Sequence, residues 1–388
     1  SNMNIGRTKP YLYLLAVFNT VGGAVMEGTE GRNIVCLSYK DLKSGVDLTS
    51  QIEEAFSSDG LGILTVSDIP HLSVCRSRLL PLARRFAMLP GEVKESFEHP
   101  ESFYAFGWSH GREKLQGKPD LAKGSYYANP QYDRPVDDES LIQQYPAFIH
   151  PNIWPTEEVP ELEDAFKALG QLIVHVGLLV AQQCDAFIES RCSTYENGKL
   201  HEAIATSLCC KARLLHYFAM SSTDLLKRSQ DTAFSDWCGW HNDHGSLTGL
   251  VPAMYFDKDG NEISNPDPES GLYIRTRDGS LCKASMPPDV LAFQIGETTQ
   301  IHSGGLLQAT PHAVRGARAP EVTRETFAVF MEPNWDRPMD VPEGCTAEEA
   351  QSQEAAAALP EGVPALRKRW EEGMNFGEFT DSTLKEYY

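Results

Sequence analysis

Two histidines and one carboxylate are the residues of this chain best suited to chemistry. His241 and Asp243 are separated by one residue, and His312 follows 69 positions after Asp243. Two imidazoles and one carboxylate can occupy one face of an octahedral iron ion and leave three positions open. Twelve residues beyond His312, Arg324 and Thr326 add a cation and a hydroxyl that can hold a carboxylate near that metal.

A histidine and an acid two positions apart form a weak signal by themselves. With 11 histidines and 54 acidic residues such pairs arise by chance, and His99-Pro100-Glu101 is a second case. His241 and Asp243 immediately precede an apolar stretch, and an extended strand points side chains two positions apart to the same face. Residues 99–101 instead contain a proline and lead into a predicted loop. The sequence therefore favours the pair at 241 and 243.

The third ligand must come from another strand that faces the same cavity. His312 follows a run of strand signals, whereas His302 lies beside Ser303-Gly304-Gly305. We therefore predict His312 as the third ligand. Each histidine taken alone is more often a hydrogen-bonded core or surface residue, so the prediction depends on the order and spacing of the whole group.

Arg324 and Thr326 alternate on a predicted strand, so their side chains face the same side. A buried arginine needs an anion, and its planar fork suits a carboxylate, to which a neighbouring hydroxyl adds a further bond. The alternative is an internal ion pair with one of the chain's many acids.

The secondary structure that must position these residues is predicted to change from mainly helical to mainly β-strand near Lys211. Between Pro160 and Cys192, apolar residues recur at three- and four-residue steps, which predicts a long buried helix. Residues 103–130 and 253–270 are predicted as loops, and Asp278-Gly279 as a two-residue hairpin turn. Earlier strands are expected at 34–37 and 61–66, and earlier helices at 48–56 and 73–87. Short strands are predicted at Ala212–Tyr217, Ser246–Val251, Gly271–Arg275, Leu281–Ser285, Val290–Ile295, Ala309–Val314 and Thr326–Glu332.

Seven short strands at this spacing indicate a sandwich, barrel or jelly roll. The expected fold class is α+β, mainly β, with a helical N-terminal region packed on the β core. We divide the chain into an N-terminal extension (1–32), an N-terminal domain (33–150), a helical connection (151–210), a β domain (211–335) and a helical tail (336–388).

Composition narrows the class of partner. The 388 residues include 34 basic and 54 acidic side chains, for a net charge of −20, which repels phosphate backbones and anionic lipid surfaces. Nine cysteines without a CxxC pair indicate a reduced intracellular protein. The apolar stretch Tyr11–Met26 is too short to span a membrane. We expect a cytoplasmic monomer that binds neither nucleic acid nor membrane.

The group His241-Asn242-Asp243, His312 and Arg324-x-Thr326 resembles the His-x-Asp…His…Arg-x-Ser pattern of the iron(II)- and 2-oxoglutarate-dependent dioxygenases. The nearest branch is the isopenicillin N synthase-like group. Flanking segments resemble the family too, namely Asp59–Gly62, Gly271–Tyr273, Pro287–Val290, Gln294–Glu297 and, in some poorly characterised eukaryotic members, Gly373–Tyr388.

The resemblance implies a double-stranded β-helix, a jelly roll whose mouth holds the iron. It implies Fe(II) on His241, Asp243 and His312, with 2-oxoglutarate and O2 as cosubstrates. The distal carboxylate of 2-oxoglutarate would contact Arg324 and Thr326, where Thr replaces the usual Ser. Leu215–Ala219 takes the place of the family's Asn-Tyr-Tyr-Pro segment, so Tyr217 is a further candidate contact.

The expected reaction is the oxidation, typically hydroxylation, of a small molecule, with release of succinate and CO2. Aromatic and polar residues near the motif are candidate substrate contacts, although each is individually more often a core residue. They are Phe218, Trp237, Trp240, His244 and Phe330, with Tyr104, Phe106, Trp108, Tyr126 and Tyr127 from the N-terminal loops. The alternatives are an iron oxidase that does not use 2-oxoglutarate and a non-catalytic jelly-roll binding protein.

Overall fold

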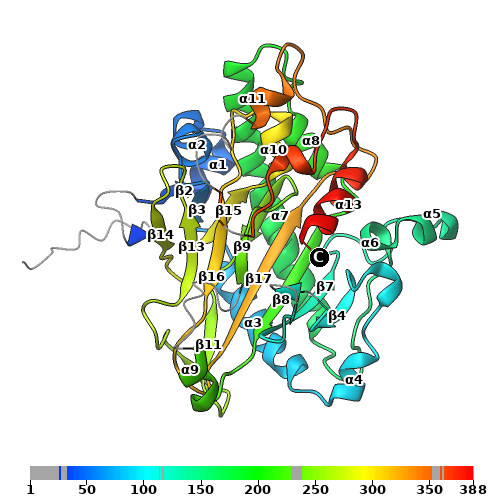
Figure 1. Ribbon diagram of the computed structural model, residues 1–388, viewed down its shortest axis with the longest axis vertical. Helices are drawn as coiled ribbons and strands as arrows, with labels where there is room; N and C mark the ends of the chain where they lie inside the picture. The colour runs from blue at the N-terminus through cyan, green and yellow to red at the C-terminus, as the bar shows by residue number, and fades with distance from the viewer. Residues whose placement is uncertain are drawn as a thin grey trace, which may run out of the picture.

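A sheet-rich α+β fold is seen in the computed structural model, which describes residues 26–27, 33–112, 114–115, 118–228, 238–351, 359–360 and 362–387. A large sheet and a smaller one enclose an apolar core that includes Leu215 and Tyr217 of the large sheet and Leu272 and Ile274 of the small one. A second core lies between the large sheet and the helices behind it (Figure 1).

The large sheet contains strands from both halves of the chain, in the order β2-β3-β15-β10-β17-β8-β7-β4, and β11 and β12 extend it beside β17. All neighbouring pairs in it are antiparallel except β2 and β3. Its strands are β2 (Val35–Ser38), β3 (Ile63–Ser67), β4 (Gly107–His110), β7 (Lys123–Ala128), β8 (Lys211–Tyr217), β10 (Leu247–Leu250), β11 (Met254–Phe256), β12 (Glu262–Ile263), β15 (Leu291–Ile295) and β17 (Thr323–Met331).

The smaller sheet has the order β1-β14-β13-β16-β9. Its strands are β1 (Met26–Glu27), β9 (Cys238–His241), β13 (Gly271–Arg275), β14 (Leu281–Ala284) and β16 (His312–Arg315), and a separate two-stranded ribbon is formed by β5 (Lys114–Leu115) and β6 (Lys118–Pro119).

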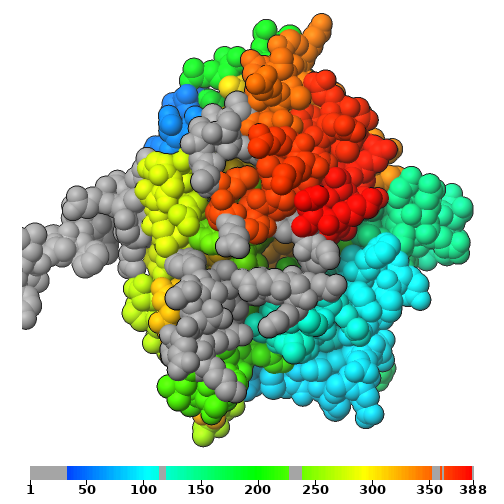
Figure 2. Space-filling model, in the orientation of Figure 1, coloured from blue at the N-terminus to red at the C-terminus, as the bar shows by residue number. Residues whose placement is uncertain are grey.

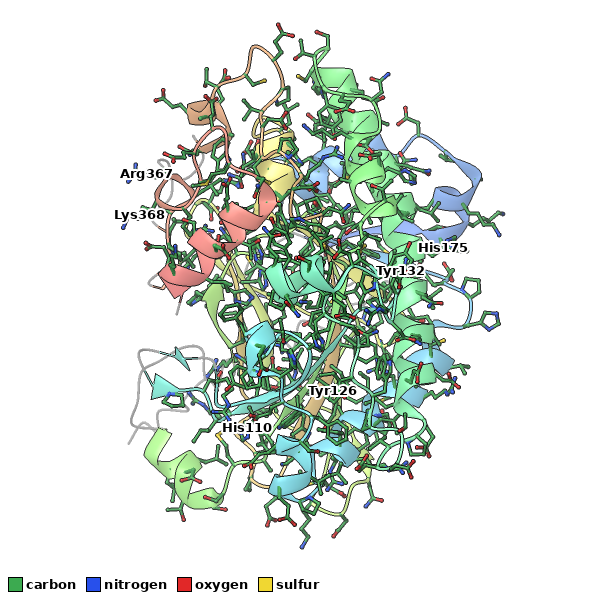
Figure 3. All side chains as sticks on the ribbon, turned by 90° about the vertical axis from the view of Figure 1, so that its right-hand side faces the viewer. His110, Tyr126, Tyr132, His175, Arg367 and Lys368 are labelled. Carbon is green, nitrogen blue, oxygen red and sulfur yellow. The ribbon has the colours of Figure 1, made fainter. Side chains whose placement is uncertain are left out.

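The central helix α7 (Leu162–Arg191) runs along the large sheet, as Figures 1 and 3 show from two directions. The apolar stripe predicted for it is confirmed, because its members at three- and four-residue spacing are buried. Phe166 of α7 meets Phe327 of β17 edge-on, with ring centroids 5.0 Å apart. His175, labelled in Figure 3, lies on the opposite side of α7 and contacts Tyr39. The helix is therefore amphipathic and covers the sheet.

Shorter helices surround this frame. They are α1 (Tyr39–Ser44), α2 (Thr49–Phe56), α3 (Leu72–Ala87), α4 (Gly91–Glu95), α5 (Glu139–Gln144), α6 (Pro146–Ile149), α8 (Lys199–Ala205), α9 (Ser222–Arg228), α10 (Glu297–His302), α11 (Ala347–Gln351) and α13 (Phe376–Tyr387), with 3-10 turns η1 (Pro100–Ser102) and η2 (Leu366–Lys368). Tyr126 of β7, labelled in Figure 3, packs edge-on against Phe86 of α3, with ring centroids 4.9 Å apart.

One helix of the described residues, α7, is long and apolar enough to cross a membrane by length and composition alone. Its most apolar window is 56% buried inside the protein, and the core helix of a soluble protein has the same properties.

Several local predictions need correction. Residues 103–130 contain strands β4 and β7, and residues 253–270 contain the hairpin β11–β12. Turn-rich sequence with Gly and Tyr residues gives a weak strand signal, and part of the pairing, that of β7 with β8 and of β11 with β17, joins segments distant in sequence. The β13–β14 hairpin is confirmed, but its loop differs from the predicted two-residue turn. Thr276 and Ser280 are still joined by a backbone hydrogen bond, so the loop between them has three residues. Residues 11–25 and Trp237 lie outside the described part of the chain.

Candidate metal centre and its surroundings

The two sheets bring His241, Asp243 and His312 together. His241 ends β9, His312 begins β16, and the two are directly paired across these antiparallel strands. Asp243 lies in the turn between β9 and β10. Its Oδ1 atom is 3.8 Å from Nε2 of His241 and 3.8 Å from Nε2 of His312. In the described part of the chain, this is the group of three His, Cys or acidic side chains with ligand atoms close enough to share one ion.

Both imidazoles are oriented by backbone carbonyl groups. Nδ1 of His241 lies 2.8 Å from the Gly239 oxygen, and Nδ1 of His312 lies 3.3 Å from the Thr310 oxygen. A carbonyl can only accept, so each Nδ1 carries a proton, and in the neutral form of each ring Nε2 is the atom that presents a lone pair. Outer-shell contacts of this kind are typical of histidines that bind a metal.

Electrostatics keep the carboxylate charged. Burial opposes ionisation of Asp243, but His312, His241 and the Thr248 hydroxyl hold its pKa below the ordinary value. Burial and the neighbouring His241 lower the pKa of His312 to about 4. For His241, burial acts in the same direction, but Cys238 and Asp243 raise its pKa to about 9.

The donor set fits a metal ion. Two Nε2 atoms and one carboxylate oxygen converge, and separations of 3.8 Å allow one ion to contact each at about 2 Å, the usual distance for such ligands. The Oδ2 atom of Asp243 is buried without a hydrogen-bond partner, which a metal would compensate. Two histidines and one carboxylate are the facial set that non-haem iron uses.

Strand register places Arg324 and Thr326 on the inner face of the large sheet. Arg324 pairs with Tyr217, and Thr326 pairs with Leu215. The Arg324 guanidinium lies 5.0 Å from the centre of the Tyr217 ring, and the Thr326 hydroxyl donates to the Val251 carbonyl at 3.2 Å. Arg324, Thr326 and Tyr217 are all buried. The alternation expected from the sequence therefore brings the three candidate 2-oxoglutarate contacts onto one face.

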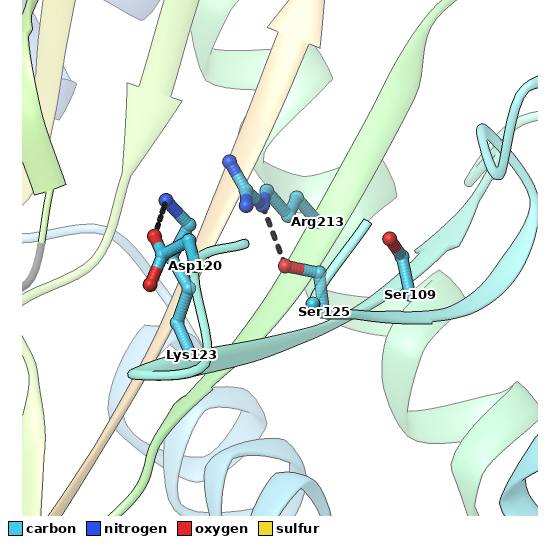
Figure 4. A pocket seen from close by; sticks show the side chains of 6 residues that line it. Ser109, Asp120, Lys123, Ser125 and Arg213 are labelled. Atoms are coloured by element: carbon cyan, nitrogen blue, oxygen red, sulfur yellow. Dashed lines mark hydrogen bonds and ion pairs between the residues drawn. The ribbon is translucent and has the colours of Figure 1, made fainter. Parts of the chain in front are cut away.

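A small polar hollow lies on the same inner face, beyond Tyr217 (Figure 4). Lys123, which pairs with Tyr217 across β7 and β8, forms a buried ion pair with Asp120 at 2.8 Å. Arg213 donates through Nε to the Ser125 hydroxyl at 2.9 Å. The sequence reasoning missed these residues, because Lys123 and Ser125 belong to strand β7, which was predicted as loop.

The candidate substrate contacts separate into two groups. Phe330 follows Arg324 and Thr326 at two-residue steps along β17, so it shares their face, next to Lys211 and Thr248. Phe218 packs against His110 and His216, with ring centroids 4.7 and 4.6 Å away, on the side of the second core, between the large sheet and the helices.

The other two candidates contact neighbouring elements. The Trp240 ring lies 5.6 Å from the Arg275 guanidinium of β13. The His244 ring stacks on Phe376 of α13, with centroids 5.6 Å apart. The structure therefore brings Phe330 to the inner face, whereas the contacts of Phe218, Trp240 and His244 are with surrounding elements.

The rival histidines lie elsewhere. His302 is in α10, where its Nε2 donates to the Pro338 carbonyl at 2.9 Å. His99 precedes η1, accepts from the Ser102 amide through Nδ1, and stacks on His150. Neither belongs to the ligand group found among the described residues.

Comparison with known proteins agrees with this geometry. Residues 34–157 match the family described as non-haem dioxygenase in morphine synthesis N-terminal. No curated protein matches the chain. The chain is similar in fold to a full-length Neurospora crassa protein, solved with alpha-KG and 5-formyluracil, at 19% identity and a TM-score of 0.64 over 92% of this chain and 96% of that one.

Two further solved structures are similar. One is a 2OG-Fe(II) oxygenase family protein from Caulobacter crescentus, at 20% identity and a TM-score of 0.64 over 91% of this chain and 99% of that one. The other is the dioxygenase for auxin oxidation in rice, at 16% identity and a TM-score of 0.55 over 91% and 95%. At these identities the likeness concerns the fold.

The family match over residues 34–157, the fold and the facial group of candidate ligands agree with one another. The N-terminal part of the chain matches a non-haem dioxygenase family, and the chain as a whole has the fold of the solved oxygenases named above.

Proposed function

We propose that this protein oxidises a small molecule at an iron centre held by His241, Asp243 and His312, and that it consumes 2-oxoglutarate. The observation that carries the proposal is the convergence of the three ligand atoms within 4.8 Å of one another. We further infer that the two sheets form a double-stranded β-helix, because β13 and β16 of the small sheet and β8 and β15 of the large one contribute side chains to a shared core.

The residues have separable roles in this proposal. The two histidines and Asp243 would hold Fe(II), with the carboxylate offsetting part of its charge. Arg324 and Thr326 would bind the distal carboxylate of 2-oxoglutarate through charge-assisted hydrogen bonds, beside the Tyr217 ring. Bound iron supplies the activation of O2, and the surrounding protein provides ligation, orientation and exclusion of water.

The inner face of the large sheet offers both apolar and polar side chains. Phe330 offers an apolar surface, while Arg213, Ser125 and the Lys123–Asp120 pair make the neighbouring wall polar. This combination favours a small molecule with both an apolar part and hydrogen-bonding groups. The similar Neurospora crassa protein has been solved in complex with thymine and with 5-formyluracil, which are also small and polar.

The test is anaerobic titration of the purified protein with Fe(II) and then 2-oxoglutarate, followed by its visible absorption. We expect a weak charge-transfer band in the native protein, and its loss in His241→Ala and Asp243→Ala. A screen of metabolites by succinate release then identifies the substrate. A native protein that binds neither Fe(II) nor 2-oxoglutarate would refute the proposal, and oxidation that persists without 2-oxoglutarate would favour an iron oxidase instead.

A further inference from the structure

A buried ion pair joins the C-terminal segment to the metal centre. Glu297, the first residue of α10, and Arg369, just after η2, have side chains that are 1% and 0% exposed. Nη1 of Arg369 donates to one carboxylate oxygen at 2.8 Å, and Nη2 donates to the other at 2.5 Å. This two-pronged geometry fixes the orientation of the carboxylate as well as its charge.

Glu297 also holds the turn that follows β9 and carries the proposed ligand Asp243. Its backbone amide donates to the Asp243 carbonyl at 2.8 Å. Its carboxylate accepts from Nδ2 of Asn242, the residue between His241 and Asp243, at 3.1 Å. One acidic residue therefore contacts both the ligand Asp243 and the spacer Asn242, through its main chain and its side chain.

Gly296 and Thr298, the residues on either side of Glu297, add further hydrogen bonds to the same turn. The Thr298 amide and hydroxyl bond to the His244 carbonyl, at 3.2 and 2.6 Å. The Gly296 amide donates to the Ser246 carbonyl at 3.1 Å. The turn from Asn242 to Ser246 is thus bonded along its length to the beginning of α10, and Glu297 is the member of that segment whose carboxylate pairs with Arg369.

The tail fixes Arg369 by several contacts of its own. Nη1 also donates to the Thr383 hydroxyl of α13 at 3.0 Å, and Nη2 to the Pro364 carbonyl at 3.1 Å. The guanidinium lies 5.7 Å from the centre of the Phe379 ring, which also contacts His244. Figure 2 shows this segment, in red, on the face of the molecule in view. Arg369 therefore connects α13 to the metal-binding turn.

We propose that Arg369 is a positioning residue of the metal centre, which acts through Glu297 on the turn Asn242–Ser246, so that the C-terminal segment sets the affinity of the site for its ion. The inference rests on the proposed function for the identity of the centre. Its physical basis is that a buried carboxylate without its cation reorients to find another partner. Such a change alters the bonds that Glu297 makes to Asn242 and Asp243.

The experiment uses the full-length, metal-free protein and Co(II) as a spectroscopic probe of the ligand geometry. Arg369→Met removes the cation, and Arg369→Lys keeps the charge but loses the fork. Arg367→Met is the matched control, because this neighbouring arginine is exposed and points outward in Figure 3. Affinity and visible absorption are measured anaerobically, and the fold of each variant is checked by circular dichroism and chemical denaturation.

We expect Arg369→Met to bind Co(II) about 10- to 100-fold more weakly, the usual effect of losing an outer-shell partner, with an altered absorption band. Arg369→Lys should recover part of the affinity, and Arg367→Met should match the native protein. A folded Arg369→Met variant with native Co(II) affinity and spectrum would overturn the inference.

A second variant covers the case in which Arg369→Met does not fold. Asn242→Ala removes the link from Glu297 to the turn but leaves the Arg369–Glu297 pair in place, so we expect a native fold with weaker Co(II) binding. Native Co(II) affinity in this variant would overturn the inference. If the native protein itself binds neither Co(II) nor Fe(II), the proposed function fails, which is distinguishable from native binding that the substitutions leave unchanged.

Discussion

Replacement of Gly296 by alanine should damage the metal centre by steric contact alone. Gly296 has φ −96° and ψ 168°, an extended conformation that alanine adopts without strain. A Cβ atom here would lie 2.0 Å from the Gly245 carbonyl oxygen and 3.2 Å from that of Asp243. Both obstacles are backbone atoms, so the two segments must separate by about 1 Å, since overpacked interiors relax by backbone shifts.

The expected loss of stability in Gly296→Ala follows from the packing and the hydrogen bonds that this separation disturbs. Overpacking a dense interior costs about 1–3 kcal/mol. The shift also stretches the bonds from the Gly296 and Glu297 amides to Ser246 and Asp243, which measure 3.1 and 2.8 Å and are worth about 1 kcal/mol each. We therefore expect Gly296→Ala to lower the free energy of unfolding by about 3 kcal/mol. A displaced Asp243 should also weaken Fe(II) binding.

The assay is urea denaturation of the metal-free protein, followed by anaerobic Fe(II) titration of the folded fraction. Gly91→Ala is the control, because a Cβ atom at this exposed first residue of α4 meets nothing within 4 Å, and its effect should stay within about 0.5 kcal/mol. If Gly296→Ala is as stable as the control and binds Fe(II) normally, the close approach of these two backbone segments does not hold Asp243 in place.

Three further predictions concern single groups. Thr326→Val should raise the KM for 2-oxoglutarate about tenfold, the value of one charge-assisted hydrogen bond, whereas Thr326→Ser should leave this KM nearly unchanged. If steady-state assays give Thr326→Val the same KM as the native protein, Thr326 does not bind 2-oxoglutarate. Breaking the buried pair of His216 and Glu325, whose atoms are 2.6 Å apart, by Glu325→Ala should cost about 3–5 kcal/mol in urea denaturation, and a double replacement by apolar residues should cost less. Burial lowers the pKa of His302 to about 3; its neutral form is fully favoured above pH 6.5, and the resulting stability is lost as the pH falls from 6.5 toward 3. Between pH 6.5 and 3, the free energy of unfolding of His302→Gln should therefore fall less steeply than that of the native protein, by up to about 1.4 kcal/mol per pH unit. Parallel plots of this free energy against pH for the two proteins would contradict the prediction.

The grouping of the candidate ligands His241, Asp243 and His312 could be predicted from the sequence because part of its geometry is local. His241 ends strand β9 and Asp243 follows at the exit of that strand, so their spacing keeps the two side chains close together. His312 needed one long-range assumption, that its strand lies beside the first. The observed pairing of His312 with His241 across β16 and β9 satisfies it.

The polar residues around Lys123 on the inner face of the large sheet could not be predicted in the same way. Lys123 and Ser125 belong to β7, a strand with glycine and tyrosine residues whose register with β8 is set by contacts distant in sequence. Without that register, nothing in the local pattern indicates that Lys123 lies beside Tyr217. The Asp120 partner lies in a stretch that composition alone described as loop.

The role of the C-terminal segment illustrates the same limit more strongly. Arg369 and Glu297 are 72 residues apart, and either charge would ordinarily be assigned to a solvated surface. Their mutual burial depends on the packing of α13 against the turn that follows β9, and no local sequence pattern indicates that packing. Because removing either member of a buried ion pair leaves an uncompensated charge in the interior, the segment around Arg369 and the turn Asn242–Ser246 should lose their order together. Denaturant-induced loss of Co(II) binding should therefore coincide with exposure of Trp370, which is 2% exposed and next to Arg369, and earlier release of the tail with the metal still bound would show that the two are independent.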